Sequence, residues 1–319
     1  MDFSEFIGLL QEIFKVALSY FVSPSKRVFW LYLITSAIIA FVIFKASKTK
    51  GNFINYLFNR KVWLSTSAIT DYLLILFNAI VKVVVLAPFF GFALYIAKST
   101  EHFFVSKYGI VDTGFTNFQL ILIYTILIVV LNDFITFILH YLMHKIPFLW
   151  EFHKVHHSAR RLNPFTQYRI HPIELIINNL GEVFSKGILT GLFLFLSAGK
   201  ISIITFLGVN ILNFLFYFFG ANLRHSHVKF KYFNFLEYIL ISPFQHQIHH
   251  SNNPAHYDTN LGSRFAFWDW MFGTLLTSKN VDKIGFGLGR EEDNAYNTFS
   301  KNLITPFKNL PKAFFKKNT

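Results

Sequence analysis

Histidines are concentrated in two short parts of this 319-residue chain. Six of the 13 lie between residues 140 and 171, and six more lie between residues 225 and 256. Within these windows they follow the patterns HxxxH (140–144), HxxHH (153–157) and HxxHH (246–250). Spacings of three and four place side chains on one face of a helix. Neutral imidazole binds Fe, Zn, Cu and Ni, so the pattern predicts a metal site.

The number of imidazoles bears on the number of ions. The three boxes supply eight: His140, His144, His153, His156, His157, His246, His249 and His250. Because a zinc site usually takes three or four protein ligands, eight imidazoles favour two metal ions. His225 is a further candidate ligand, whereas His171, His227 and His256 could equally lie beside the site or on the surface.

A carboxylate precedes the first box on the same predicted helix. Asp133, His140 and His144 stand at i, i+7 and i+11, within about 40° of one another on a helix. A carboxylate there could fix the tautomers of the two imidazoles. Ionisable groups in apolar segments are functional candidates, although Asp133 could also pair with a lysine or the backbone.

The composition predicts a membrane protein. Hydrophobic residues make up 53% of the chain and charged residues 15%, against about 25% charged in soluble domains. Candidate spans are residues 28–44, 72–97, 118–139, 173–196 and 201–219, and residues 6–22 form a candidate interfacial helix. We therefore expect an all-α integral membrane protein, with about four to five membrane-embedded helices and a cytoplasmic helical cap that carries the histidine boxes.

Loop charges predict the orientation. The 45–67 loop contains five basic residues and no acid, which places it in the cytoplasm. The end of the third span, at His140, then lies on the same side, and a 173–219 hairpin returns the chain there before His225. His102 falls on the opposite side. The net charge of +13 then reflects a membrane surface rather than nucleic acid.

These motifs together resemble the fatty acid hydroxylase (sterol desaturase) superfamily. Besides the three boxes, the resemblance includes His171-Pro-Ile-Glu174, Asn253-Pro-Ala-His-Tyr-Asp-Thr-Asn260 and Phe267-Trp-Asp-Trp-Met-Phe-Gly-Thr274. It covers roughly residues 120–276. We accordingly divide the chain into an N-terminal membrane region (1–117), a hydroxylase-like catalytic domain (118–276) and a basic C-terminal tail (277–319).

The resemblance implies a membrane-embedded di-iron site that activates O₂ and attacks an unreactive C–H bond of a lipid, such as a fatty acyl chain or a sterol. Zinc could replace the two iron ions in a purified sample. By this resemblance the metal ligands are His140, His144, His153, His156, His157, His225, His246, His249 and His250, and we place Asp133 and Glu174 in the catalytic site. Hydroxylation, desaturation and ether cleavage all remain open as the reaction.

The resemblance also implies partners and a location. We expect an external electron donor, of the cytochrome b5 or ferredoxin/reductase type, because the chain contains no recognisable cytochrome b5 heme segment. The expected location is the bacterial inner membrane, or the endoplasmic reticulum if the source is eukaryotic, with the active site on the cytoplasmic face. No nucleic-acid partner is expected.

Two other classes of protein compete with this interpretation. A zinc-dependent membrane hydrolase would need fewer ligands, and the chain lacks the HExxH motif. A metal transporter or metal-binding protein would place its ligands near the membrane midplane, whereas these boxes fall at helix ends and in predicted cytoplasmic segments.

The charge pattern predicts a cytoplasmic C-terminus. The tail carries five lysines and no acid between residues 301 and 317, interleaved with phenylalanines. Each lysine near an anionic leaflet contributes about 1 kcal/mol of attraction. A reporter fused at Thr319 should therefore be active in the cytoplasm. A reporter active only on the other side would invert the whole topology.

Overall fold

The computed structural model describes residues 2–202, 205 and 210–315. Within this part of the chain the regular elements are helices, and strand-like pairing is limited to two isolated bridges, Leu240–Phe265 and Ser251–Phe286. Three helices are long and apolar enough to cross a membrane: Thr66–Leu86, α7 (Asn117–Lys145) and α9 (Pro172–Leu196). The expected all-α integral membrane protein is confirmed at this level.

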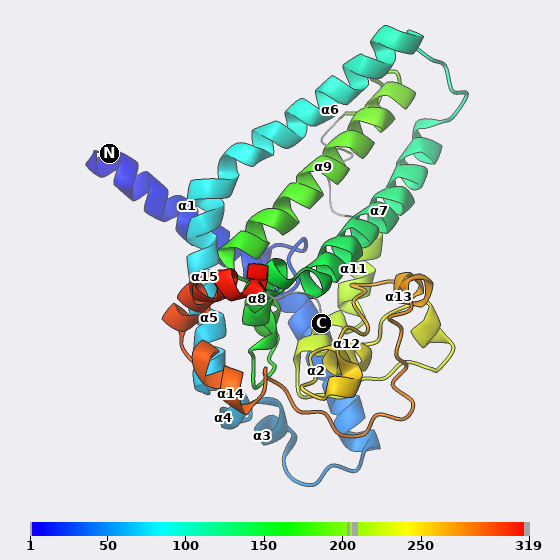
Figure 1. Cartoon of the computed structure of the whole chain (residues 1–319). Coiled ribbons are helices and arrows are strands. Elements are labelled where there is room, and N and C mark those ends of the chain that lie inside the picture. The colour runs from blue at the N-terminus through cyan, green and yellow to red at the C-terminus, as the bar shows by residue number, and fades with distance from the viewer. Residues whose placement is uncertain (1, 203–204, 206–209, 316–319) are drawn as a thin grey trace.

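The long helices α6 (Ala87–Tyr108), α9 and α7 lie side by side, with α9 packed against both of the others (Figure 1). Glycines on α9 allow the close approach to α6. A Cβ on Gly187 would lie 2.8 Å from Ile96 Cγ2, and one on Gly191 would lie 2.6 Å from Thr100 Cβ. Small residues that let helix backbones approach closely are typical of membrane helix pairs.

The other predicted spans coincide less closely with single long helices. Residues 28–44 fall in α2 (Trp30–Ala46), which is apolar but has only 17 residues. Residues 72–97 belong to a continuous run of α5 (Thr66–Val81), the π-helical turn η1 (Lys82–Leu86) and α6. In the predicted span 201–219, residues 203–204 and 206–209 lie outside the described residues, and α11 covers Ile211–Phe218.

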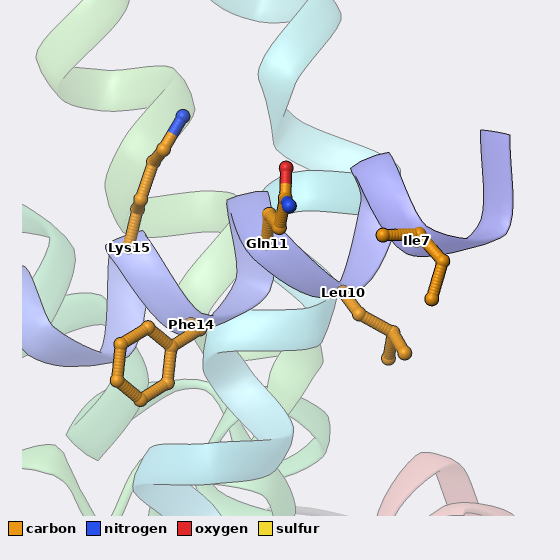
Figure 2. Close-up of a pocket in the computed structure, with 5 residues that line it drawn as sticks. All are labelled: Ile7, Leu10, Gln11, Phe14 and Lys15. Carbon is orange, nitrogen blue, oxygen red and sulfur yellow. The ribbon is translucent and has the colours of Figure 1, made fainter. Parts of the chain in front are cut away.

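The predicted interfacial segment is α1 (Phe3–Val22), which projects from the side of the molecule and packs against α5 (Figure 1). Asp2 and Glu5 cap its N-terminus reciprocally. Apolar side chains on its outer face remain exposed, including Phe3 and Phe14. The helix also carries a shallow pocket of about 420 Å³, lined by Ile7, Leu10, Gln11, Phe14 and Lys15 (Figure 2). This pocket contains no histidine, so it is separate from the histidine boxes.

Short helices gather at one end of the long ones (Figure 1). They include α3 (Phe53–Leu57), α4 (Arg60–Trp63), α8 (Pro147–His157), α12 (Pro243–His249), α13 (Phe267–Phe272) and α14 (Arg290–Asp293). The basic tail contributes α15 (Phe299–Phe315), which packs against α8, with the rings of Phe152 and Phe307 5.4 Å apart.

A buried ion pair ties this end of the molecule to α5. Arg169 Nη1 lies 3.1 Å from Asp71 Oδ1, and both side chains are almost fully buried. The same guanidinium donates to the Val155 carbonyl and to Ser158 Oγ, which closes the end of α8. Because breaking a buried pair leaves an unpaired charge, this contact holds α8 firmly beside α5.

Candidate metal centre

Four elements bring the nine predicted ligands together. The last turns of α7 carry His140 and His144, and the chain turns at Ile146 directly into α8, which carries the second box. The third box lies on α12, whose start is capped by Ser242 and Gln245. His225 ends the short 3₁₀ helix η3 (Ala221–His225).

The nine imidazoles form two groups, and within each group the potential ligand atoms all lie within 4.8 Å of one another. We call them the five-histidine group (His140, His144, His153, His157 and His249) and the four-histidine group (His156, His225, His246 and His250). Each HxxHH box therefore contributes to both. The groups adjoin, since the ring centroids of His157 and His250 are 4.6 Å apart.

The ring nitrogens are arranged as ligands of shared ions would be. In the four-histidine group the Nε2 atoms of His225, His246 and His250 lie 3.1 to 3.2 Å from one another. In the other group His140 Nε2 lies 3.0 Å from His153 Nε2. Nitrogen ligands at 2.0–2.1 Å from one ion lie about 2.9 to 3.4 Å apart, so both separations fit a metal ion.

Orphaned nitrogens support the same conclusion. His144 Nε2, His157 Nε2 and His249 Nε2 are buried and have no hydrogen-bond partner among the described residues. Buried polar atoms normally have partners because leaving one unsatisfied costs about 1–3 kcal/mol. A bound cation would satisfy all three nitrogens, so the residues fit a metal.

Burial keeps these imidazoles neutral. It is the main cause that lowers the pKa of His156, His157, His225, His246, His249 and His250 well below the usual range. Neighbouring imidazoles lower the pKa values further, and Arg224 adds to the effect on His225 and His246. Metal ligation requires the neutral ring, which this environment supplies at neutral pH.

One short segment, residues 258–261, provides acceptors behind three rings of the five-histidine group. His144 Nδ1 lies 3.2 Å from Asp258 Oδ1, His249 Nδ1 2.9 Å from the Thr259 carbonyl, and His140 Nδ1 2.7 Å from the Leu261 carbonyl. Each acceptor favours a hydrogen on Nδ1, which leaves the Nε2 lone pair free for a metal.

The 258–261 segment adopts an unusual backbone that other residues stabilise. Asp258 and Asn260 have positive φ values of 56° and 53°, a conformation that non-glycine residues adopt at some cost. Asp269 accepts hydrogen bonds from the amides of Leu261 and Gly262, at 2.7 and 2.8 Å. Burial raises the pKa of Asp269 to about 6.

The two predicted catalytic carboxylates lie in different surroundings. Glu174 Oε1 is 3.0 Å from His153 Nδ1, so Glu174 supports a ring of the five-histidine group. Asp133 instead accepts hydrogen bonds from the Phe265 amide and from Trp268 Nε1. Of the two expectations for Asp133, these contacts match pairing with the backbone rather than support of the first box. Asp133 lies about 10 Å along the helix from His140, too far for a carboxylate to reach the ring, and it anchors the 265–268 turn instead.

The other histidines belong to neither group. His171 caps α9, and its Nε2 lies 3.2 Å from the Leu303 carbonyl on α15. The ring of His227 packs on Tyr56, and His256 lies in the short 3₁₀ helix η5 (Pro254–His256). His102 is exposed on α6.

Sequence reasoning missed most of the acceptors behind the rings. Asp258 stands inside one of the quoted motifs, yet its pairing with His144 depends on a contact across 114 residues. The carbonyls of Thr259, Leu261 and Arg169 carry no sequence signal, because every residue has a carbonyl group.

Residues 125–274 match the fatty acid hydroxylase family. This part of the chain therefore resembles that family, as the motifs predicted. Curated relatives include alkylglycerol monooxygenases from Xenopus tropicalis (29% identical over 156 residues) and Danio rerio (30% over 149 residues), and the ornithine lipid hydroxylase OlsE from Rhizobium tropici (29% over 162 residues).

The similarity covers only part of each protein. The aligned regions span 49%, 47% and 50% of this chain, but only 31%, 29% and 44% of those relatives, respectively. The family match includes all nine histidines, together with Asp133, Glu174 and the 258–261 segment. No solved structure matches the chain significantly.

Replacing the carboxylates behind the rings should weaken metal binding. We expect Asp258→Asn and Glu174→Gln each to lower the affinity for Zn²⁺ about 10- to 100-fold, the usual effect of losing a partner of a ligand histidine. The affinity is measured by competition with a chromophoric chelator. Asp112→Asn, in an exposed loop, is the matched control and should bind normally. Unchanged affinity in both test variants would contradict the assigned roles.

Chelator-treated protein should lose stability as the pH falls below about 6.5, the usual histidine pKa in an unfolded chain. In the folded protein burial lowers the pKa values of six of these imidazoles. Below pH 6.5 the unfolded state therefore binds more protons, so stability is complete above that pH and declines beneath it. The thermal midpoint at pH 5 should be lower than at pH 8, and equal midpoints would refute the prediction.

Proposed function

We propose that this protein is an O₂-dependent lipid hydroxylase that holds two iron ions, one in each histidine group. The observation that carries the proposal is the pair of adjoining groups of buried, neutral imidazoles. Nine imidazoles exceed the needs of a single zinc ion, which takes three or four protein ligands. The matched family and the curated relatives, named as hydroxylases and monooxygenases, support the same chemistry.

The proposed reaction converts a C–H bond, O₂, two electrons and two protons into an alcohol and water. Bound iron supplies the activation of O₂, which amino-acid side chains cannot provide. The protein holds the ions, orients the substrate and restricts water. The ligand rings outside α7 are 2–7% exposed, so the centre is largely shielded from solvent.

Glu174 is the residue we propose to handle a proton at the centre. Its Oε1 accepts from His153 Nδ1, whereas its Oε2 is buried without a partner among the described residues. A carboxylate with one oxygen unused can hold a proton beside the reacting groups. Asp133 has an indirect, positioning role, because it holds the turn that follows the 258–261 segment.

The proposed substrate is a membrane lipid. The names of the relatives refer to alkylglycerols and to ornithine lipid, both of which are amphiphiles. The apolar helices α7 and α9 run away from the end of the molecule that contains α8 and α12, and they are long enough to cross a bilayer (Figure 1). A lipid could therefore reach the centre from the bilayer without crossing water.

We further propose that the histidine groups face the cytoplasm and receive electrons from a separate protein of the cytochrome b5 or ferredoxin/reductase type. The basic 45–67 loop, which contains α3 and α4, lies at the same end of the molecule as α8 and α12 (Figure 1). A positive loop favours the cytoplasmic side, where reductants are available.

Single histidine replacements test this function. His156→Ala and His249→Ala each remove a buried ligand from one group and should abolish oxidation, whereas the exposed His102→Ala should be silent. Purified protein is supplied with O₂, a reductant and lipid extract, and products are detected by the added mass of one oxygen atom. Metal is counted in parallel. One equivalent or less in active protein would contradict a two-iron centre, and activity without O₂ would contradict an oxygenase.

A further inference from the structure

Six basic side chains that the histidine chemistry does not use lie together beside the metal centre. We call them the basic cluster: Lys26, Arg27, Lys82, Lys186, Arg224 and Arg264. Arg224 and Arg264 both face the ring of Phe216, with their Cζ atoms 5.2 and 4.7 Å from its centroid. Arg27 Cζ lies 5.8 Å from the centroid of the neighbouring Tyr217 ring. Lys26 and Lys82 share the ring of Tyr20, with their Nζ atoms 5.9 and 4.9 Å from its centroid, and Lys186 lies near enough to repel Lys26.

Acidic side chains neutralise the basic cluster only in part. Glu182 forms an ion pair with Lys186, at 2.7 Å, and Asp133 interacts electrostatically with Arg224 and Arg264. Six cations thus face two carboxylates. Because buried charges are costly unless they are paired, the cluster favours binding of a further anion.

Two arginines in the cluster each have a hydrogen-bond donor that is not used by the described residues. Arg224 Nη2 and Arg264 Nε are buried and have no partner among the described residues. Other nitrogens of the same guanidinium groups are used, by the Ala221 carbonyl and by Asn213 Oδ1. A guanidinium presents its donors in a planar fork that matches the oxygens of a carboxylate or a phosphate.

The cluster is accessible at its Lys186 end, and its Arg224 and Arg264 end adjoins the metal centre. Lys186 and Glu182 keep 40% and 56% of their side-chain surface accessible. Arg224 directly precedes His225 of the four-histidine group, and Arg264 follows the 258–261 segment that supports the five-histidine group. Lys186 lies on α9, one of the apolar membrane helices. An anion bound here would therefore lie between the histidine groups and the bilayer.

We propose that the basic cluster binds the anionic headgroup, a carboxylate or a phosphate, of a lipid substrate. This inference rests on the proposed function and names the class of lipid. The headgroup is held beside the metal centre, and the apolar chain extends along the membrane helices. The carbon atoms nearest to the headgroup are then the ones presented for oxidation, rather than the end of the chain.

Binding of dodecyl phosphate to the full-length protein in neutral detergent tests this proposal. Thermal stabilisation, which follows ligand affinity by mass action, is compared with that given by 1-O-dodecylglycerol, a neutral amphiphile, and by inorganic phosphate. We expect dodecyl phosphate to bind at least about tenfold more tightly than either, since a hydrogen bond to a charged group contributes this much. Equal binding of the neutral amphiphile would overturn the proposal. Equal binding of inorganic phosphate would indicate a site for a free anion and would overturn the lipid assignment.

Variants locate the binding to the basic cluster. Arg27→Gln and Lys186→Gln should each weaken dodecyl phosphate binding about tenfold or more. Lys186→Arg keeps the positive charge and should bind dodecyl phosphate as tightly as the native protein. Lys107→Gln removes an exposed charge from the far part of α6 and should have no effect. Unaltered affinity in both glutamine variants would refute the assignment.

Metal counted in the same samples separates this inference from the proposed function. A protein that holds two metal ions but shows no preference for the anion overturns only the headgroup assignment. A protein that binds dodecyl phosphate through the cluster but holds no metal contradicts only the two-iron centre.

Discussion

The structure depends on one unfavourable contact, the burial of nine imidazoles against one another. Nitrogen atoms that face each other at 3.0 to 3.4 Å in a dry environment cannot all be satisfied by sharing hydrogens. Protonation would add repulsion, and burial already opposes it. A shared cation resolves this conflict. The hydrogen bonds and ion pairs around the centre therefore keep the rings in place until such an ion binds.

These supporting contacts lie on two sides of the metal centre. The 258–261 segment orients the rings of the five-histidine group, and Asp269 holds that segment from behind. On the other side, the Arg169–Asp71 pair fixes the end of α8 against α5. Backbone carbonyls and buried carboxylates, rather than long flexible side chains, perform most of this positioning. A rigid support of this kind is what keeps ligand geometry within the narrow limits that metal chemistry requires.

The sequence was most informative where chemistry and periodicity coincide. Helical spacing of the histidines identified the three boxes, and runs of apolar residues located α7 and α9 to within a few residues. It was least informative for long-range contacts. Asp133 shares a helical face with the first box, yet its partner is a turn 132 residues away. The division of each HxxHH box between two groups likewise depends on how α8 and α12 face each other, which local spacing does not determine.

The distribution of ligands along the chain has a consequence for how the centre is built. Four of the five rings in the five-histidine group come from the 18 residues between His140 and His157, on the consecutive helices α7 and α8. The four-histidine group draws on residues from His156 to His250. Closing a short loop takes less chain entropy than closing a long one. Bringing those four rings together therefore costs less chain entropy than assembling the four-histidine group, and both groups are completed only by ligands from the third box.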